Sequence, residues 1–258
     1  MRWRHGGSRA VVTGGTRGIG LAVVLELLEL GASVVTAGRD LEELDPRLAP
    51  ARVAGRLTLI AADLAMAEGR AALVDVIPDA WDALEILVNN VGTNVRRPSL
   101  AVTTDDYQRI LDTNVMCAWD LSRALHPRLA ASGRGAIVNV GSVAGQVSVG
   151  TGAVYAMSKA AIEQLTRYLA VEWARDGIRV NAVAPWYIRT PLVEPILGDP
   201  ATLARVLAVT PMGRVGEPHE AAAAIVFLCL PAASFVTGQV LAADGGFLAY
   251  GFSPRPPA

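Results

Sequence analysis

The stretch "VVTGGTRGIGLAV", residues 11–23, decides the fold, because a β-like run passes through a glycine-rich turn into a helical pattern. Gly14, Gly18 and Gly20 permit a tight turn and a close approach of the backbone to a diphosphate. The start of the following helix supplies free N–H groups and a positive partial charge. The spacing is G-x-x-x-G-x-G instead of the common G-x-G-x-x-G, so a tight strand–helix turn without a ligand remains the alternative.

The same alternation of strand and helix patterns continues along the chain. It predicts a single-domain, Rossmann-type α/β fold over residues 1–258, with a doubly wound parallel sheet of about seven strands and helices on both faces. Strands are expected at residues 9–14, 33–38, 57–63, 84–92, 135–142, 178–185 and 239–246. Helices are expected at 18–31, 103–129 and 153–177, with a weaker one at 40–55 that Pro46 and Pro50 interrupt. A Pro-rich tail at about 252–258 is expected to be irregular.

The composition narrows the class of protein. Hydrophobic residues make up 52% and charged residues 18%, which suits a buried parallel sheet. The net charge of −1 argues against nucleic-acid or anionic-membrane partners. No apolar run is long enough to span a bilayer, and the first residues lack the apolar region of a secretory signal, so we expect a cytoplasmic protein. Cys117 and Cys229 are expected to be buried thiols, and His5, His126 and His219 have no metal-ligand spacing, so no metal is predicted.

The end of the second strand, "VVTAGRD", indicates which dinucleotide binds. An acidic residue there usually recognises a ribose 2′-hydroxyl, but this chain has small residues followed by Arg39. A guanidinium suits a 2′-phosphate through charge-assisted hydrogen bonds, and Arg17 in the glycine turn adds a second positive charge. We therefore predict NADP(H) in preference to NAD(H). The alternatives are that both arginines are solvated, or that Arg39 pairs with Asp40.

Several motifs together resemble the short-chain dehydrogenase/reductase family over almost the whole chain: "TGGTRGIG", "NNVG", "LDTNV", "NVGSVAG" and "YAMSK". The second has Val91 where the family usually has alanine. The resemblance assigns the family's catalytic set to Asn114, Ser142, Tyr155 and Lys159. "NNVGTNVRRPS" and "LAVEWARDGIRVNAVAP" are similar to the tropinone-reductase-like branch, whose members are NADPH-dependent carbonyl reductases with widely varying substrates.

The glycine turn and the resemblance also imply the cofactor contacts. Asp63 would border the adenine, Asn90 and Gly92 would line the cofactor after the fourth strand, and Thr190 would contact the nicotinamide carboxamide. The full set of expected contacts is Gly14, Thr16, Arg17, Gly18, Ile19, Gly20, Arg39, Asp63, Leu64, Asn90, Gly92, Tyr155, Lys159, Pro185, Ile188 and Thr190.

Reduction of a ketone needs a hydride at carbon, which the cofactor supplies, and a proton at oxygen. Tyr155 is the candidate acid, with an ordinary pKa of roughly 10. Lys159, four residues on along the same helix face, is expected to favour the phenolate and lower that pKa. The resemblance implies that Ser142 bonds the substrate oxygen and that Asn114 holds a water on the proton path to Lys159. Tyr155 and Lys159 alone could be an exposed helix pair, but Ser142 and the glycine turn argue against that.

A substrate loop is expected at about 186–215, after the sixth strand. Trp186 stands where the family usually has glycine after Pro185. Trp186 and Tyr187 either narrow the pocket or pack against the loop or a neighbouring subunit. The expected substrate contacts are Asn94, Val95, Val143, Val147, Val149, Trp186, Tyr187, Leu192 and Ile196.

Charged residues near this pocket bear on the substrate. We expect Arg96 and Arg97 to face solvent or a helix, which favours a neutral or mostly apolar ketone over an acidic one. Glu194 is the nearest, weak candidate to bind a cationic amine ketone.

The leading hypothesis is an NADPH-dependent ketone reductase that also acts as an alcohol dehydrogenase in reverse. The alternatives are a 3-oxoacyl-carrier-protein reductase and a dinucleotide-binding regulator without turnover. The resemblance implies a homodimer or homotetramer that packs through its long fourth and fifth helices, although core burial also explains their apolar residues.

Overall fold

The computed structural model describes residue 3 and residues 6–251, so His5 and the tail expected at 252–258 lie outside the described residues. Every expected strand run forms a strand, and within the described part the strands make one seven-stranded parallel sheet. The strands are β1 Arg9–Thr13, β2 Ser33–Gly38, β3 Leu57–Ala61, β4 Ile86–Asn89, β5 Gly135–Val140, β6 Ile178–Pro185 and β7 Val240–Ala243.

The strand order is β3-β2-β1-β4-β5-β6-β7, and each neighbouring pair runs parallel. The chain winds outward from β1 through β2 to β3, then crosses back to β4 and winds the other way. The order therefore reverses between β1 and β4. Ligands of such sheets bind beyond the carboxyl ends of the strands at this reversal, which confirms the predicted doubly wound fold and locates the site.

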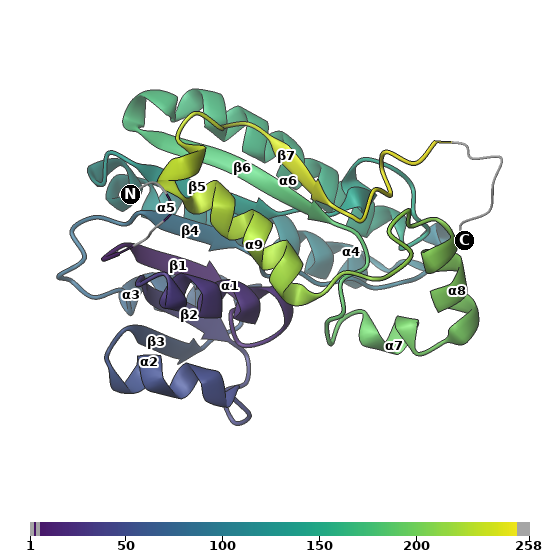
Figure 1. The fold of residues 1–258 in the computed structure, drawn as a ribbon, viewed down its shortest axis with the longest axis horizontal. Helices are drawn as coiled ribbons and strands as arrows, with labels where there is room; N and C mark the ends of the chain where they lie inside the picture. Colours follow the sequence, from purple (N-terminus) through teal and green to yellow (C-terminus); the bar gives the residue numbers. More distant parts are fainter. Residues whose placement is uncertain (1–2, 4–5, 252–258) are drawn as a thin grey trace.

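Helices cover both faces of the sheet (Figure 1). Successive strand residues alternate between two apolar layers: Ala10 and Val12 belong to one, and Val11 to the other. The first layer packs against α1 Gly18–Glu29, α2 Ala49–Val53 and α9 Pro218–Cys229. The second packs against α3 Ala67–Asp75, α5 Cys117–Ala131 and α6 Ala153–Glu172. The two short helices α7 Glu194–Leu197 and α8 Pro200–Ala208 lie beyond the carboxyl ends of the strands (Figure 1).

Two expected helices differ from the prediction. The weak one at 40–55 shrinks to a 3-10 turn, Pro46–Leu48, followed by α2, because proline fits only the first turn of a helix. The helix expected at 103–129 forms, but it is not one regular α-helix. It divides into α4 Thr104–Leu111, a π-helical segment Asp112–Met116 and α5.

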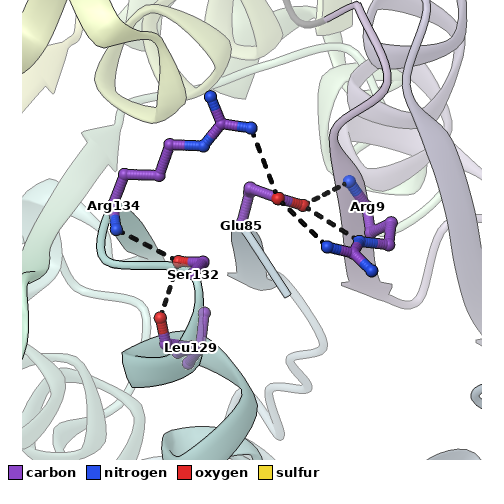
Figure 2. A network of polar contacts seen from close by, with 5 residues as sticks. All are labelled: Arg9, Glu85, Leu129, Ser132 and Arg134. Atoms are coloured by element: carbon purple, nitrogen blue, oxygen red, sulfur yellow. Dashed lines mark hydrogen bonds and ion pairs between the residues drawn. The ribbon is translucent and has the colours of Figure 1, made fainter. Parts of the chain in front are cut away.

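The amino end of the sheet is closed by a buried carboxylate, Glu85, whose side chain is 9% exposed (Figure 2). It accepts hydrogen bonds from the Arg9 backbone N–H at 2.8 Å and from the Arg9 and Arg134 guanidinium groups at 3.4 Å. The turn that carries Arg134 is held by Ser132, whose hydroxyl donates to the Leu129 carbonyl at 2.6 Å. Burial alone would raise the Glu85 pKa, but these contacts outweigh it and lower that pKa below its ordinary value of 4.5.

Cys117 and Cys229 are buried and free, as expected. Burial raises the pKa of both thiols to about 12. Among the described residues, no helix has the length and apolar character that crossing a membrane requires.

Candidate active site

The glycine turn lies at the carboxyl edge of the sheet, between β1 and α1. Gly14 and Gly18 have positive φ angles of 69° and 57°, a conformation that L side chains rarely adopt. A Cβ atom on Gly14 would lie 2.9 Å from Val91 Cγ2, and one on Gly18 would lie 3.2 Å from Thr190 Cγ2. A Cβ on Gly20 would overlap the Gly14 carbonyl. All three glycines are therefore required, by the local packing or by the backbone conformation.

Two arginines next to this turn have no ion-pair or hydrogen-bond partner within the described range. Arg17 and Arg39 are both exposed. Asp40 instead accepts a hydrogen bond from the backbone two residues on, at 2.8 Å, so the expected alternative of an Arg39–Asp40 pair does not form. A Cβ on Gly38 would lie 2.5 Å from Thr16 Cγ2, so the end of β2 touches the glycine turn and brings Arg39 close to it.

Residues after β3 and β4 complete the expected dinucleotide site. Asn90 Nδ2 donates to the carbonyls of Thr13 at 2.9 Å and Gly14 at 3.2 Å, which ties β4 to the glycine turn. Asp63 is exposed just after β3, whereas Leu64 beside it is buried. The geometry of the glycine cradle fits a dinucleotide.

Asn114 lies in the π-helical segment between α4 and α5, and its residue is 3% exposed. Its Oδ1 accepts from the Thr93 backbone N–H at 2.7 Å, and its Nδ2 donates to the Thr93 carbonyl at 3.0 Å and to Ser158 Oγ at 2.9 Å. Ser158 in turn donates to the Tyr155 carbonyl at 2.7 Å. The amide therefore links the segment after β4 to α6, and Oδ1 accepts no second hydrogen bond from the described part of the chain. Short π-helical segments are frequent at functional sites.

Lys159 brings the expected catalytic residues together. It is 3% exposed, its Nζ donates to the Val140 carbonyl at 2.8 Å, and Nζ lies 5.7 Å from the centroid of the Tyr155 ring. A Cβ on Gly92 would lie 3.5 Å from Lys159 Nζ and 3.6 Å from Asn114 Oδ1, so glycine keeps the space between these two groups open. Burial lowers the pKa of Lys159 to about 8.

The expected lowering of the Tyr155 pKa by Lys159 is not what the structure gives. Burial raises the pKa of Tyr155, and the hydrogen bond with Ser142 and the charge of Arg96 offset this only partly. The physical reason is that removing a phenolate from water costs more than these contacts return. The Ser142 oxygen also accepts from the Ala144 backbone N–H at 3.2 Å.

Comparisons with known proteins agree with this geometry. A family model described as enoyl-(acyl carrier protein) reductase matches residues 14–248. A tropinone reductase homolog from Arabidopsis thaliana is 48% identical over 98% of this chain and 96% of its own length. The chain belongs to the short-chain dehydrogenase/reductase family. It is therefore an oxidoreductase with a Rossmann-type fold.

Two further relatives describe the range of the family around this chain. A chloroplastic tropinone reductase homolog from Arabidopsis thaliana is 45% identical over 98% of this chain and 80% of its own length. A crystal structure of gluconate 5-dehydrogenase from Burkholderia cenocepacia, in complex with NADP and tartrate, is 34% identical. It covers 97% of this chain and 98% of its own, with a TM-score of 0.89.

A groove of about 820 Å³ runs beside the first turns of α6 in this short-chain dehydrogenase/reductase. Val147 and Val149, both expected to contact substrate, line it. Val143 does not, because it is 1% exposed and belongs to the interior. Asn94 is held near the groove, since its Nδ2 donates to the Thr151 carbonyl at 3.0 Å.

Trp186 and Tyr187 pack against the substrate loop and the end of the chain. The Trp186 ring stacks on Phe247 with centroids 3.9 Å apart and meets Tyr187 edge-on at 4.6 Å. Its Nε1 donates to Thr210 Oγ1 at 3.0 Å. These contacts favour the packing alternative for Trp186. The two aromatic residues also line a separate cavity of about 350 Å³ near the end of β7.

The remaining residues of the loop expected at 186–215 differ in their burial and in their contacts. Ile188 is buried and forms a bridge with Gly216, so the loop is tied back to the chain before α9. Leu192 is exposed and Ile196 is half-buried on α7. Glu194 forms an ion pair with Arg189 at 3.4 Å, so this acid is already occupied.

Two functional features were missed by sequence reasoning. Ser158 joins Asn114 to α6, and its position directly before Lys159 was an available signal. Arg96 and Arg97 were expected to behave alike, whereas the charge of Arg96 acts to lower the pKa of Tyr155. Across residue 3 and residues 6–251, no cluster of three or more His, Cys, Asp or Glu side chains suits a metal ion.

Proposed function

We propose that this chain is an NADPH-dependent ketone reductase, which acts on the reverse reaction as an alcohol dehydrogenase. One observation carries the proposal: Tyr155, Lys159 and Asn114 converge around Gly92 at the same edge of the sheet as the glycine turn. We take residues 1–258 as a single NAD(P)-binding domain with a substrate loop at about 186–215.

NADPH is the proposed cofactor because Arg17 and Arg39 flank the glycine turn without protein partners in the described part of the chain. A 2′-phosphate would give both guanidinium groups an anion, whereas a 2′-hydroxyl would leave their charge unused. The NADP complex of the gluconate 5-dehydrogenase supports the same choice. When bound, the cofactor supplies the hydride that reaches the substrate carbon.

The side chains of the chain supply the proton and hold the substrate oxygen. Ser142 donates its hydroxyl proton to that oxygen when substrate is bound, which stabilises the negative charge that develops there. Tyr155 gives its phenolic proton to the same oxygen. Its raised pKa keeps the phenol protonated at neutral pH, which suits a general acid in the direction of reduction. We assign a second hydrogen bond of Asn114 Oδ1 to a water that returns a proton through Lys159.

Replacement of the acid tests this proposal. Tyr155→Phe should lower kcat for ketone reduction by at least about 100-fold, because the proton donor is lost. NADPH binding, followed by nicotinamide fluorescence, should be retained. Tyr168→Phe is the matched control, because Tyr168 lies on the same helix and is 66% exposed. Retention of most of kcat in Tyr155→Phe would refute the assignment.

The alternative of a 3-oxoacyl-carrier-protein reductase is kept because the matching family model, described as enoyl-(acyl carrier protein) reductase, also names a carrier-protein substrate. A 3-oxoacyl thioester tested beside simple ketones distinguishes the two substrate classes. A regulator without turnover would oxidise NADPH with neither.

We also propose that copies of the chain assemble into a homodimer or homotetramer through α5 and α6. Trp119 on α5 and Met157, Tyr168 and Val171 on α6 are exposed large apolar side chains. Light scattering measures the assembly. We place the protein in the cytoplasm, where free thiols such as Cys117 and Cys229 persist.

A further inference from the structure

The segment after β3, residues 62–66, lies against the glycine turn. The Ala62 backbone N–H donates to the Gly38 carbonyl at 3.0 Å, and Gly38 itself touches Thr16 of the turn. Asp63 follows on this segment with an exposed side chain, and it is the residue expected to border the adenine of the cofactor. A carboxylate can accept a hydrogen bond from the adenine amino group. It does so effectively only where the surrounding structure holds it in the right orientation.

Arg70, on α3, holds this segment by its backbone carbonyl groups. Its Nη1 donates to the Leu64 carbonyl at 3.1 Å and to the Ala65 carbonyl at 2.8 Å. Its Nη2 forms an ion pair with Asp120 on α5 at 2.8 Å. The Arg70 side chain is 11% exposed, and its Nε is buried without a partner within the described range. Moving this guanidinium would leave further buried donors unpaired, so the three contacts fix its position.

The start of α3 also fits closely against the same segment. A Cβ on Gly69 would overlap the Asp63 carbonyl oxygen, and the Met66 backbone N–H donates to that oxygen at 3.1 Å. The Asp63 side chain is tied to the same turn, since its Oδ1 accepts from the Ala65 backbone N–H at 3.1 Å. The orientation of the Asp63 carboxylate therefore depends on the backbone of its own segment, and Arg70 holds that backbone.

We propose that Arg70 is a positioning residue for the adenine end of the cofactor. Anchored on Asp120, its guanidinium group holds the carbonyls of the segment after β3 and thereby directs the Asp63 carboxylate toward the adenine amino group. This inference rests on the dinucleotide site of the proposed function and adds to it a residue that acts through Asp63. Arg70 then determines how well the chain recognises adenine, and it leaves the transfer of hydride and proton unchanged.

The experiment compares NADPH with its deamino form, in which hypoxanthine replaces adenine and the amino donor is lost. Nicotinamide fluorescence gives the Kd of each dinucleotide without any ketone, and the measured quantity is the ratio of the two Kd values. Wild-type protein should bind NADPH about tenfold more tightly, the range expected for one hydrogen bond to a charged group. Arg70→Met should lower this preference to less than about twofold. A general loss of structure would weaken both dinucleotides alike and leave the ratio unchanged.

Arg56→Met is the matched control. Arg56 also donates through Nη1 to two backbone carbonyls, those of Leu28 at 2.8 Å and Ala32 at 3.3 Å, but it lies at the amino end of the sheet. This variant should keep the wild-type preference for adenine. Asp120→Asn is the second test variant, because it removes the anchor of Arg70 from a side chain that is 33% exposed and so disturbs folding less. It should lower the preference at least about threefold.

The outcomes separate this inference from the proposed function. An undiminished preference for adenine in Arg70→Met would overturn the inference, and Asp120→Asn decides in the same way if Arg70→Met does not fold. Equal binding of the two dinucleotides by wild-type protein would also overturn it, while the binding of NADPH would still uphold the dinucleotide site. Failure of wild-type protein to bind NADPH at all would reject both proposals.

Discussion

The two ends of the sheet each bury a charged side chain, but the two side chains differ in how many hydrogen-bond partners the protein gives them. At the amino end, Glu85 is surrounded by donors from Arg9 and Arg134, and the charges satisfy one another (Figure 2). At the carboxyl end, Lys159 donates to one carbonyl, and its ammonium group has two further donors with no acceptor among the described residues. A buried charged group whose hydrogen-bonding atoms are all engaged by the protein stabilises the fold. A buried charged group with unengaged donors can also bind a ligand.

The surface arginines follow the same division. Arg9 and Arg134 are bound to Glu85, whereas Arg17, Arg39 and Arg96 near the carboxyl edge have no partner in the described part of the chain. An exposed guanidinium without a protein partner is solvated, and its donors stay available to an anionic ligand. The difference between the two ends therefore predicts where substitutions affect turnover and where they affect folding.

The largest effect on turnover is expected at Lys159. Lys159→Met should lower kcat/KM for ketone reduction about 1,000-fold, within the range for loss of acid–base assistance. Its melting temperature should stay close to that of wild type, because relief from burying an amine offsets the lost bond to Val140. NADPH oxidation and thermal melting measure the two quantities. More than a tenth of the wild-type kcat/KM in this variant would contradict the assigned role.

The second prediction concerns the protonation state of the Lys159 amine. Burial with one acceptor should place its midpoint near pH 8, against an ordinary value of 10.5. The amine is then charged below pH 8 and neutral above it, so its positive charge beside Tyr155 disappears as the pH rises. Lys159 is the only lysine in the sequence. Protein grown with 13C-labelled lysine should therefore give a single side-chain resonance to titrate by NMR, and a midpoint above pH 10 would show that the charge is well compensated.

A smaller effect on turnover is expected at Arg39, beside the glycine turn. Arg39→Ala should lower kcat/KM with NADPH about 10- to 100-fold, because one charge-assisted hydrogen bond is worth about 1.5–3 kcal/mol. The kcat/KM with NADH should not fall, since that cofactor lacks the 2′-phosphate. Arg47→Ala, which removes a charge already paired with Asp45, is the control. An equal loss with both cofactors would mean that Arg39 supports the fold instead of the phosphate.

The comparison also separates what the sequence can predict from what it cannot. All seven strands were predictable, because a strand covered on both faces, such as "GAIVNV" at 135–140, is an almost unbroken apolar run. The π-helical segment at Asp112–Met116 was not, because the apolar spacing continues through it. Its cause is tertiary: the Asn114 amide is bonded to Thr93 and Ser158, which are distant in sequence.

The adjacent arginines show the same limit at the site. Arg96 and Arg97 are equivalent in the sequence, and only the position of Asp106 on α4 distinguishes them. The pKa shift of Tyr155 is a further case, because the direction of the shift depends on how deeply the phenol is buried. Spacing alone places Lys159 on the same helix face as Tyr155. It does not report that the Lys159 amine is directed to Val140.

The smallest effect on turnover, and a clear effect on stability, is expected at the amino end. Glu85→Gln should leave kcat/KM within about twofold of wild type and lower the free energy of unfolding by about 1–3 kcal/mol, the worth of charged hydrogen bonds. Arg134→Gln is the control. The Arg134 side chain is 62% exposed, so its loss should cost less than about 1 kcal/mol.

The pH dependence of that loss tests its electrostatic origin. The pKa of Glu85 is lower in the folded protein than its ordinary value of 4.5, so the folded state favours the ionised form. The stabilisation is then complete above pH 4.5 and disappears as the pH falls through the folded-state pKa. Urea unfolding of wild type and Glu85→Gln between pH 7 and pH 3 should give two stability curves that are parallel at first and converge below pH 4.5. Curves that stay parallel to pH 3 would mean that Glu85 stabilises the sheet through packing alone, and that the two ends of the sheet do not differ in the way described.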